Sequence, residues 1–215
     1  MQTPLWQFWT DWTIKALAAV ATLLVVLIAL LGARFRHWIA PPRLRIALAS
    51  PEGWRGNLYT LDPETRIASQ TPGIWYHVDV INDARWNPVT GVHIFLGSVE
   101  VPDASGMLKP IWEGNVALGW RHEPSPQPKT IGYSAQCDLC HVIKDPRQAR
   151  LSPLIKGQAP DTFTGPFKIA ATLQARGIEA DSGSLRIEIS WNGEWSDNED
   201  EMKRHLVVRE VPVTE

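Results

Sequence analysis

The feature that most constrains this chain is an uncharged apolar run near its N-terminus. Residues 13–33 read TIKALAAVATLLVVLIALLGA, and no charged residue occurs from Ala16 to Ala33. At about 1.5 Å per residue, roughly 20 helical residues cross the ~30 Å hydrocarbon core of a bilayer. Lys15 stands at the edge of the run, where its aliphatic stem can reach the interface. The sequence therefore predicts one transmembrane helix at 13–38, preceded by a short extracytoplasmic segment at 1–12.

Two other interpretations of this run are a buried core helix and a cleavable signal peptide. Buried helices rarely reach this length without a polar residue. A signal peptide has an apolar region of about 7–15 residues behind a positively charged leader, whereas residues 1–14 contain Asp11 and no Lys or Arg. Tryptophans flank the run on both sides, as in the aromatic belts of membrane proteins: Trp6, Trp9, Trp12 and Trp38. The membrane-spanning interpretation takes precedence on these grounds.

The charges that flank the run predict its orientation. Cationic residues stay on the cytoplasmic side of a membrane, and the C-terminal flank carries most of them: Arg34, Arg36, Arg43 and Arg45. We therefore expect a single-pass protein of the plasma (inner) membrane, with the bilayer as one partner and the C-terminal domain in the cytoplasm. Pro41-Pro42 cannot continue a helix, so residues 39–42 are predicted as a linker.

The rest of the chain shows the period-two alternation of half-buried strands. Alternating segments lie at 44–48, 74–82, 92–96, 167–175, 185–191 and 205–208. Directly after the third of these, Gly97 suggests a bulge, because the apolar positions change parity at Val99. Short strands separated by Pro, Gly, Asn and Asp, with no long amphipathic helix between them, favour an antiparallel sandwich. The predicted fold class is all-β, an immunoglobulin-like β-sandwich at 43–211 preceded by one transmembrane helix, with a short tail at 212–215.

Turn residues predict how these strands are connected. Asn192-Gly193 lies between Trp191 and Trp195 and favours the positive φ angles of a type I′ turn, so we expect a hairpin tip there. The longest loops are predicted at 50–73, 102–113, 121–129 and 144–166.

A resemblance agrees with this layout. The segments WYHVDVINDARWNPVTGVHIFL, LGW, CDL and SLRIEISWNGEW resemble a pattern in uncharacterised bacterial membrane-anchored proteins with an immunoglobulin-like domain. Those proteins pair a hydrophobic N-terminus with a strand of the form V-x-V-x-N and a partner strand. The resemblance covers roughly residues 43–210. It implies a fold and an anchored layout, and it carries no catalytic residue.

The pentapeptide Cys137-Asp138-Leu139-Cys140-His141 has the C-x-x-C-H form that attaches a c-type haem. However, IGYSAQCDLCHV continues a strand alternation, in which residues three apart face opposite sides. We therefore expect Cys137 in the core and Cys140 as an edge or surface thiol. Haem attachment requires the two sulfurs to converge, and a structural zinc site requires four ligands where this motif supplies three at most. A membrane-anchored cytochrome, with haem on Cys137 and Cys140 and His141 as axial ligand, remains an alternative.

Other sequence patterns give no catalytic motif. His122-Glu123 begins like a zinc-protease motif, but Pro124 prevents the required helix. The acidic run at 194–201 lacks the glycine and spacing of an EF-hand and is predicted as a solvated loop, with a calcium site as the alternative. A net charge of −2 gives no reason to expect nucleic acid. We expect no enzyme activity, no metal and no cofactor.

Tryptophan provides the remaining functional signal, because the chain contains 11 of them. Trp54, Trp86 and Trp112 fall in or beside predicted loops, where tryptophan often anchors a protein partner. The alternative is that they cap the ends of the sandwich. The leading hypothesis is a membrane-anchored, non-catalytic binding or scaffolding module that faces the cytoplasm and holds a protein partner. An accessory subunit of a membrane complex is a further alternative.

Overall fold

The structure, a computed structural model, describes residues 5–39, 41–61, 68–123, 127–153 and 157–213. In the first helix, side chains are described at residues 13–28, 32 and 38. The chain divides into two compact units, Met1–Pro41 and Pro42–Glu215.

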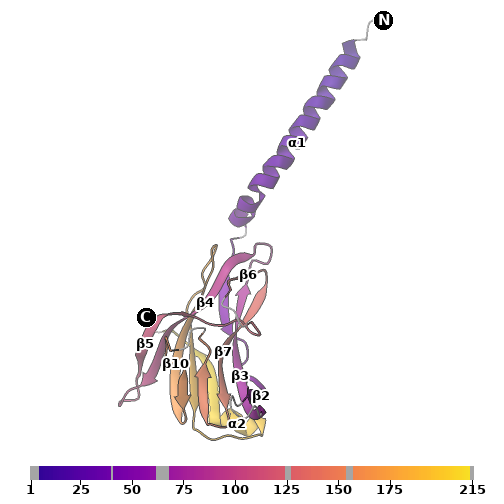
Figure 1. Ribbon diagram of the computed structural model, residues 1–215. Helices are drawn as coiled ribbons and strands as arrows, with labels where there is room; N and C mark the ends of the chain where they lie inside the picture. Colours follow the sequence, from indigo (N-terminus) through magenta and orange to yellow (C-terminus); the bar gives the residue numbers. More distant parts are fainter. Residues whose placement is uncertain (1–4, 40, 62–67, 124–126, 154–156, 214–215) are drawn as a thin grey trace. The chain divides into compact units, whose positions relative to one another are not determined.

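The first unit contains one long helix, α1 (Leu5–Ile39) (Figure 1). The helix includes the predicted span at 13–38 and begins earlier, within the segment expected to precede it. Apolar side chains are exposed along its described middle part, with Leu17 70% and Ile28 68% exposed. In the part of the chain that the structure describes, no helix combines the length and the apolar character of a membrane crossing. The predicted transmembrane helix is therefore not supported by this structure.

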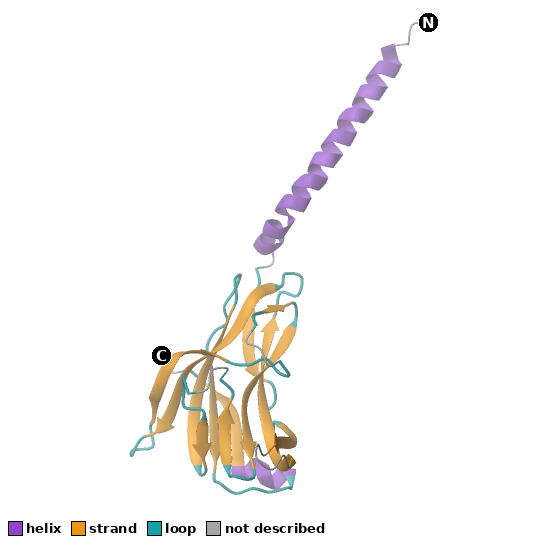
Figure 2. Cartoon of the chain, viewed as in Figure 1, coloured by secondary structure: helices purple, strands orange, loops and turns teal. Residues whose placement is uncertain are grey.

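The second unit consists of two antiparallel sheets of six strands each (Figure 2). The first sheet has the order β1-β3-β7-β8-β9, and β2 also pairs with β3. Its strands are β1 (Leu44–Leu48), β2 (Trp54–Leu61), β3 (Ala68–Asn82), β7 (Ser134–Ile143), β8 (Gln148–Leu151) and β9 (Thr162–Thr164). The second sheet has the order β12-β11-β10-β4-β5, and β6 pairs with β4. Its strands are β4 (Val89–Pro102), β5 (Leu108–Ala117), β6 (Lys129–Ile131), β10 (Phe167–Arg176), β11 (Leu185–Trp191) and β12 (Leu206–Val211).

The two sheets share one apolar core, as a sandwich requires. From β3, Tyr76 and Val78 contribute buried side chains, and from β11 Ile187, Ile189 and Trp191 do so. In these two strands, the alternation in the sequence therefore predicted correctly that these residues face inward. The all-β, antiparallel, two-sheet class is confirmed.

The predicted bulge at Gly97 is confirmed by both neighbouring strands. On β10, the register passes from Thr172↔Ser98 to Leu173↔Leu96, and on β5 it is also irregular between Leu96 and Ser98. Gly97 is thus the extra residue. Leu96 and Val99 are both fully buried, which explains why the apolar parity changes between them.

Three of the predicted loops are wrong, because they contain strands. β2 and the start of β3 lie in 50–73, the start of β5 lies in 102–113, and β8 and β9 lie in 144–166. β2 and the first part of β3 are mostly exposed, with Tyr59 71% exposed, so they pair through their backbones without an apolar alternation. Part of the fourth predicted loop, residues 124–126, lies outside the described residues, and β6 begins at Lys129.

The hairpin predicted at Asn192-Gly193 is also wrong. Gly193 has a φ of 87°, but Asn192 is not among the residues with positive φ. Asn192 Oδ1 instead accepts a hydrogen bond from the backbone of Glu194 at 2.9 Å. β11 does pair with β12, from Trp191↔Leu206 onward, but a helix lies in the connection.

That helix, α2 (Glu199–His205), occupies part of the predicted acidic loop. Asn198 caps it, because its Oδ1 accepts from the backbone N–H of Glu201 at 3.1 Å. The acidic residues of the first turn lie where the helix dipole favours negative charge: Glu199, Asp200 and Glu201. Met202 is buried and fixes the helix to the sandwich. The last three residues of the acidic run therefore form the first turn of a helix.

Asn82, the last residue of the V-x-V-x-N strand, joins three segments of the sandwich. It is fully buried, and its Nδ2 donates to the carbonyl of Asn87 at 2.9 Å and to that of Ile131 at 3.2 Å. Its Oδ1 accepts from the backbone of Ala84 at 3.1 Å. The side chain thereby holds the β3–β4 turn against β6.

We expect the Asn82→Ala variant to lose about 2–4 kcal/mol of unfolding free energy, because it leaves buried backbone groups without partners. Urea denaturation of the purified chain measures this loss. The control is Asn115→Ala, at an exposed position of β5, with an expected change within about 0.5 kcal/mol. Equal stability of the two variants would contradict the bracing role of Asn82.

Candidate functional site

An aromatic row crosses the outer face of the first sheet. Trp54 of β2 pairs with Trp75 of β3, and Trp75 pairs with His141 of β7. Paired residues point to the same face of a sheet, so the three rings lie side by side. The rings of Trp75 and His141 are stacked, with centroids 6.0 Å apart and an angle of 21° between the planes.

Two glycines make room for the central indole of this row. A Cβ added at Gly73 would lie 2.8 Å from the Trp75 ring, and one at Gly56 would lie 3.2 Å from it. Gly56 and Gly73 are themselves register partners. The Trp75 side chain therefore lies flat over a gap in the sheet surface that any other residue type would fill.

A bulge in β7 brings an acid and a histidine next to this row. The register passes from Tyr76↔Cys140 to His77↔Asp138, which leaves Leu139 as the extra residue. His77 Nδ1 lies 2.8 Å from Asp138 Oδ1, without the angle of a hydrogen bond, and His77 is only 4% exposed. The His77 ring also contacts Trp54, with centroids 4.8 Å apart.

The segment after β5 adds the side chains of Arg121 and His122. The backbone N–H of Arg121 donates to the carbonyl of Gln136 at 3.0 Å, which places the segment beside β7. The Arg121 guanidinium donates to the Gln136 side-chain oxygen, and its Cζ lies 5.3 Å from the Trp54 ring centroid. His122 follows with a φ of 62°, which is uncommon for a non-glycine residue and is concentrated at functional sites.

These side chains enclose a cleft of about 310 Å³, which we call the Trp54 cleft. Its lining consists of Trp54, Arg55, Gly56, Asn57, Trp75, His77, Arg121, His122 and Asp138. Indole walls beside several N–H donors suit a ligand that is flat or apolar at one end and polar at the other.

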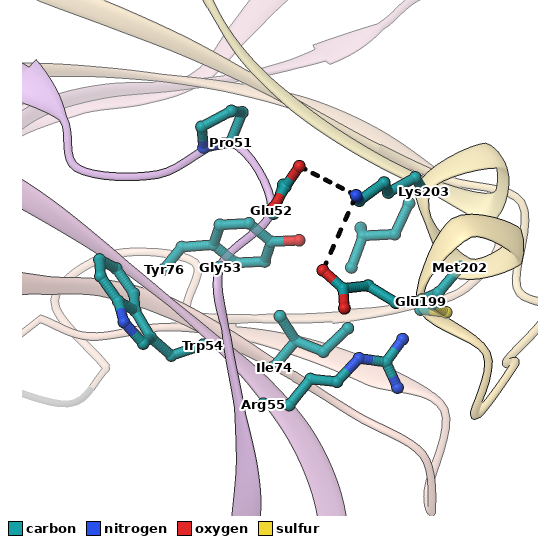
Figure 3. A pocket seen from close by; sticks show the side chains of 11 residues that line it. Pro51, Glu52, Gly53, Trp54, Arg55, Ile74, Tyr76, Glu199, Met202 and Lys203 are labelled. Carbon is teal, nitrogen blue, oxygen red and sulfur yellow. Dashed lines mark ion pairs between the residues drawn. The ribbon is translucent and has the colours of Figure 1, made fainter.

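Figure 3 shows a second cavity, of about 200 Å³. It adjoins the cleft, since Trp54 and Arg55 line both. Lys203 of α2 closes its rim, with Nζ 2.9 Å from Glu52 and 3.7 Å from Glu199. Tyr76 lies in its wall, and burial raises the pKa of this phenol well above its ordinary value. The hydroxyl is therefore a neutral donor.

The structure does not bring the three predicted partner-binding tryptophans together. Trp54 lies in the cleft. Trp86 is 80% exposed, in the turn between β3 and β4. Trp112 belongs to β5 of the other sheet, where it packs against the core and covers Gly114. Neither Trp86 nor Trp112 lines the two cavities that contain Trp54.

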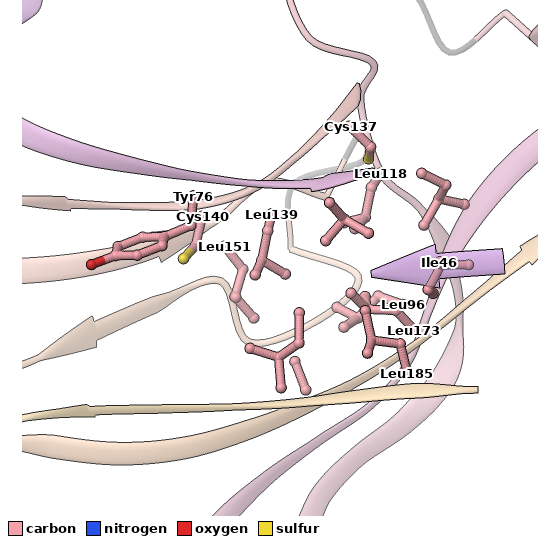
Figure 4. Packing of buried hydrophobic residues seen from close by; sticks show 14 of the residues in the cluster. Ile46, Tyr76, Leu96, Leu118, Cys137, Leu139, Cys140, Leu151, Leu173 and Leu185 are labelled. Atoms are coloured by element: carbon pink, nitrogen blue, oxygen red, sulfur yellow. The ribbon is translucent and has the colours of Figure 1, made fainter. Parts of the chain in front are cut away.

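The two cysteines lie in the sandwich interior, and the sequence was wrong about Cys140. Cys137 is fully buried as predicted, but Cys140 is also buried, at 1% exposure, because the bulge at Leu139 turns it inward (Figure 4). Figure 4 shows Cys137 beside Leu118 and Cys140 beside Tyr76, with Leu139 between them.

This arrangement does not fit a covalent haem. Both sulfurs face the apolar core, whereas the ring of His141 lies on the outer face against Trp75. Burial raises the pKa of both thiols well above the ordinary value. Burial, and then the charge of Arg150, lowers the pKa of His141. Within the described residues, no three His, Cys, Asp or Glu side chains gather as a metal site.

Sequence reasoning missed most of the cleft. Trp75 and His77 are two residues apart on one strand, and this spacing was the one sequence signal that they share the outer face. Arg121 and His122 fell in a predicted loop, and the bulge at Leu139 has no glycine to mark it. Comparison with protein-family models finds no match, and no curated protein matches the chain either.

We expect neither cysteine to react with a maleimide in the folded protein, because both thiols are buried and neutral. After denaturation, mass spectrometry should show both labelled, since the chain contains two cysteines and both are free. Rapid labelling of Cys140 in the native protein would show that this thiol faces solvent, as the unbulged strand predicts.

Proposed function

We propose that this chain is a membrane-anchored, non-catalytic binding module whose sandwich holds a protein partner through the Trp54 cleft. The observation that carries the proposal is the cleft itself, in which tryptophans and cationic side chains from three separate segments meet on the outer face of one sheet. Tryptophan and arginine are the residue types that most often dominate binding energy at protein interfaces.

The anchor is proposed from α1. Six consecutive apolar side chains, from Leu23 to Ile28, are 44–68% exposed. Since a helical turn has about 3.6 residues, they surround the whole helix. A helix that is apolar all round is buried in protein or in a membrane. The described side chains at 13–28 cover about 24 Å of helix, and the uncharged sequence continues to Ala33.

The proposed orientation places the sandwich on the cytoplasmic side of the plasma membrane. The arginines after the apolar run support it: Arg34, Arg36, Arg43 and Arg45. The immunoglobulin-like class is part of the same proposal. Two antiparallel sheets over one core support that class. An immunoglobulin domain usually has seven to nine strands in total, and the two six-stranded sheets of this unit contain more.

We expect the full chain to remain in the membrane pellet after alkaline carbonate extraction. A Leu24→Glu/Leu27→Arg double variant should move to the supernatant, because charges at the bilayer centre are costly. A green fluorescent protein fused after Glu215 should fluoresce, and alkaline phosphatase at the same position should be inactive. Active phosphatase would overturn the orientation, and extraction of the unaltered chain would overturn the anchor.

We expect a protein partner to be cross-linked and purified with the tagged full chain from native membranes, in a fixed ratio. Trp54→Ala should reduce its yield about tenfold or more, as at an interface hot spot. Trp112→Ala, on the opposite sheet, is the matched control and should retain the partner. Trp86→Ala tests the second exposed candidate. If Trp86→Ala loses the partner and Trp54→Ala retains it, the partner binds at the β3–β4 turn and not at the cleft.

A further inference from the structure

We propose that the Trp54 cleft recognises a carboxylate on an acidic segment of the partner protein, and that Arg121 is the group that binds it. This inference rests on the proposed binding function and names the chemistry that the partner presents.

The charges in the lining favour an anion. Arg55 and Arg121 contribute two permanent positive charges, against the one carboxylate of Asp138. Asp138 already lies 2.8 Å from His77 Nδ1. In the described residues, Arg121 forms no ion pair, and its guanidinium bonds only to the neutral side chain of Gln136. Its positive charge is therefore left for a ligand.

The Arg121 guanidinium is held in place before any ligand arrives. Gln136 accepts one of its five N–H donors, and the Trp54 ring supports the guanidinium from one side. Gln136 is itself fixed, because its Nε2 donates to Asp79 Oδ1 at 2.9 Å. A planar guanidinium with free donors matches the two oxygens of a carboxylate. Pre-organisation lowers the entropy cost of binding.

The walls of the cleft favour a peptide over a free ion. Trp54 and Trp75 offer indole surface beside the cation, which suits the methylene groups of a glutamate and the neighbouring main chain. A volume of about 310 Å³ is at the small end of ligand cavities, so the cleft accommodates a short stretch of side chains. Arg55 lies on the same rim, but it donates to main-chain carbonyls, with Asp197 at 3.1 Å. That makes Arg121 the residue to test.

The experiment measures fluorescence anisotropy of a labelled tetraglutamate peptide, with the purified full chain in detergent micelles. We expect the unaltered chain to bind this peptide and to ignore tetraglutamine. Arg121→Gln should weaken binding at least tenfold, whereas Arg204→Gln, which removes an exposed cation of α2, should leave affinity within twofold. Thermal unfolding of each variant checks that it is folded.

Asp138→Asn is a second variant that predicts the opposite sign. Asp138 is the only carboxylate among the described residues of the lining. Its removal should strengthen tetraglutamate binding about threefold or more, which a merely unfolded cleft would not do. Equal binding by the unaltered chain and Arg121→Gln overturns the proposal, as does no binding at all at millimolar peptide. Inorganic phosphate is added as a competitor. If it displaces the peptide at an equal concentration, the cleft binds anions in general and the proposal of a peptide carboxylate is overturned. A chain that still purifies with its partner while it ignores tetraglutamate refutes this inference alone.

Discussion

The bulge at Leu139 is the constraint on which the face with the Trp54 cleft depends. In a regular strand, Cys137, Leu139 and His141 would share one face, and His141 would point into the core. The extra residue lets both Leu139 and Cys140 face inward, and His141 returns to the outer face against Trp75. A single irregularity thus completes the core and the aromatic row together.

Most of the residues that line the cleft lie on hydrogen-bonded strands. Trp54, Trp75, His77 and Asp138 all lie on strands, and Arg121 belongs to a segment that hydrogen-bonds to β7. Sites on sheet elements hold their side chains more accurately than sites on free loops. Gly56 and Gly73 lie under the Trp75 ring. Since neither has a side chain, the indole can lie close to the backbone of the sheet.

The sequence predicted the parts of the fold that depend on apolar alternation. β1, β10 and β11 agree with the predicted strands, and Gly97 marked its bulge. It failed where pairing has no apolar signature, as in β2 and β9, and where Asn198 begins a helix in an acidic run. Of the residues that line the cleft, only Trp54 was predicted from the sequence as a partner-binding residue. The other lining residues come together through the strand register and through the bulge in β7.

The two buried thiols have a consequence for where this domain can fold. Each cysteine contributes to the core as a small apolar side chain, and both are free. The sandwich therefore needs no oxidative folding machinery, and neither a reducing nor an oxidising redox poise changes its covalent structure while it stays folded. The same covalent structure therefore suits a reducing or an oxidising compartment.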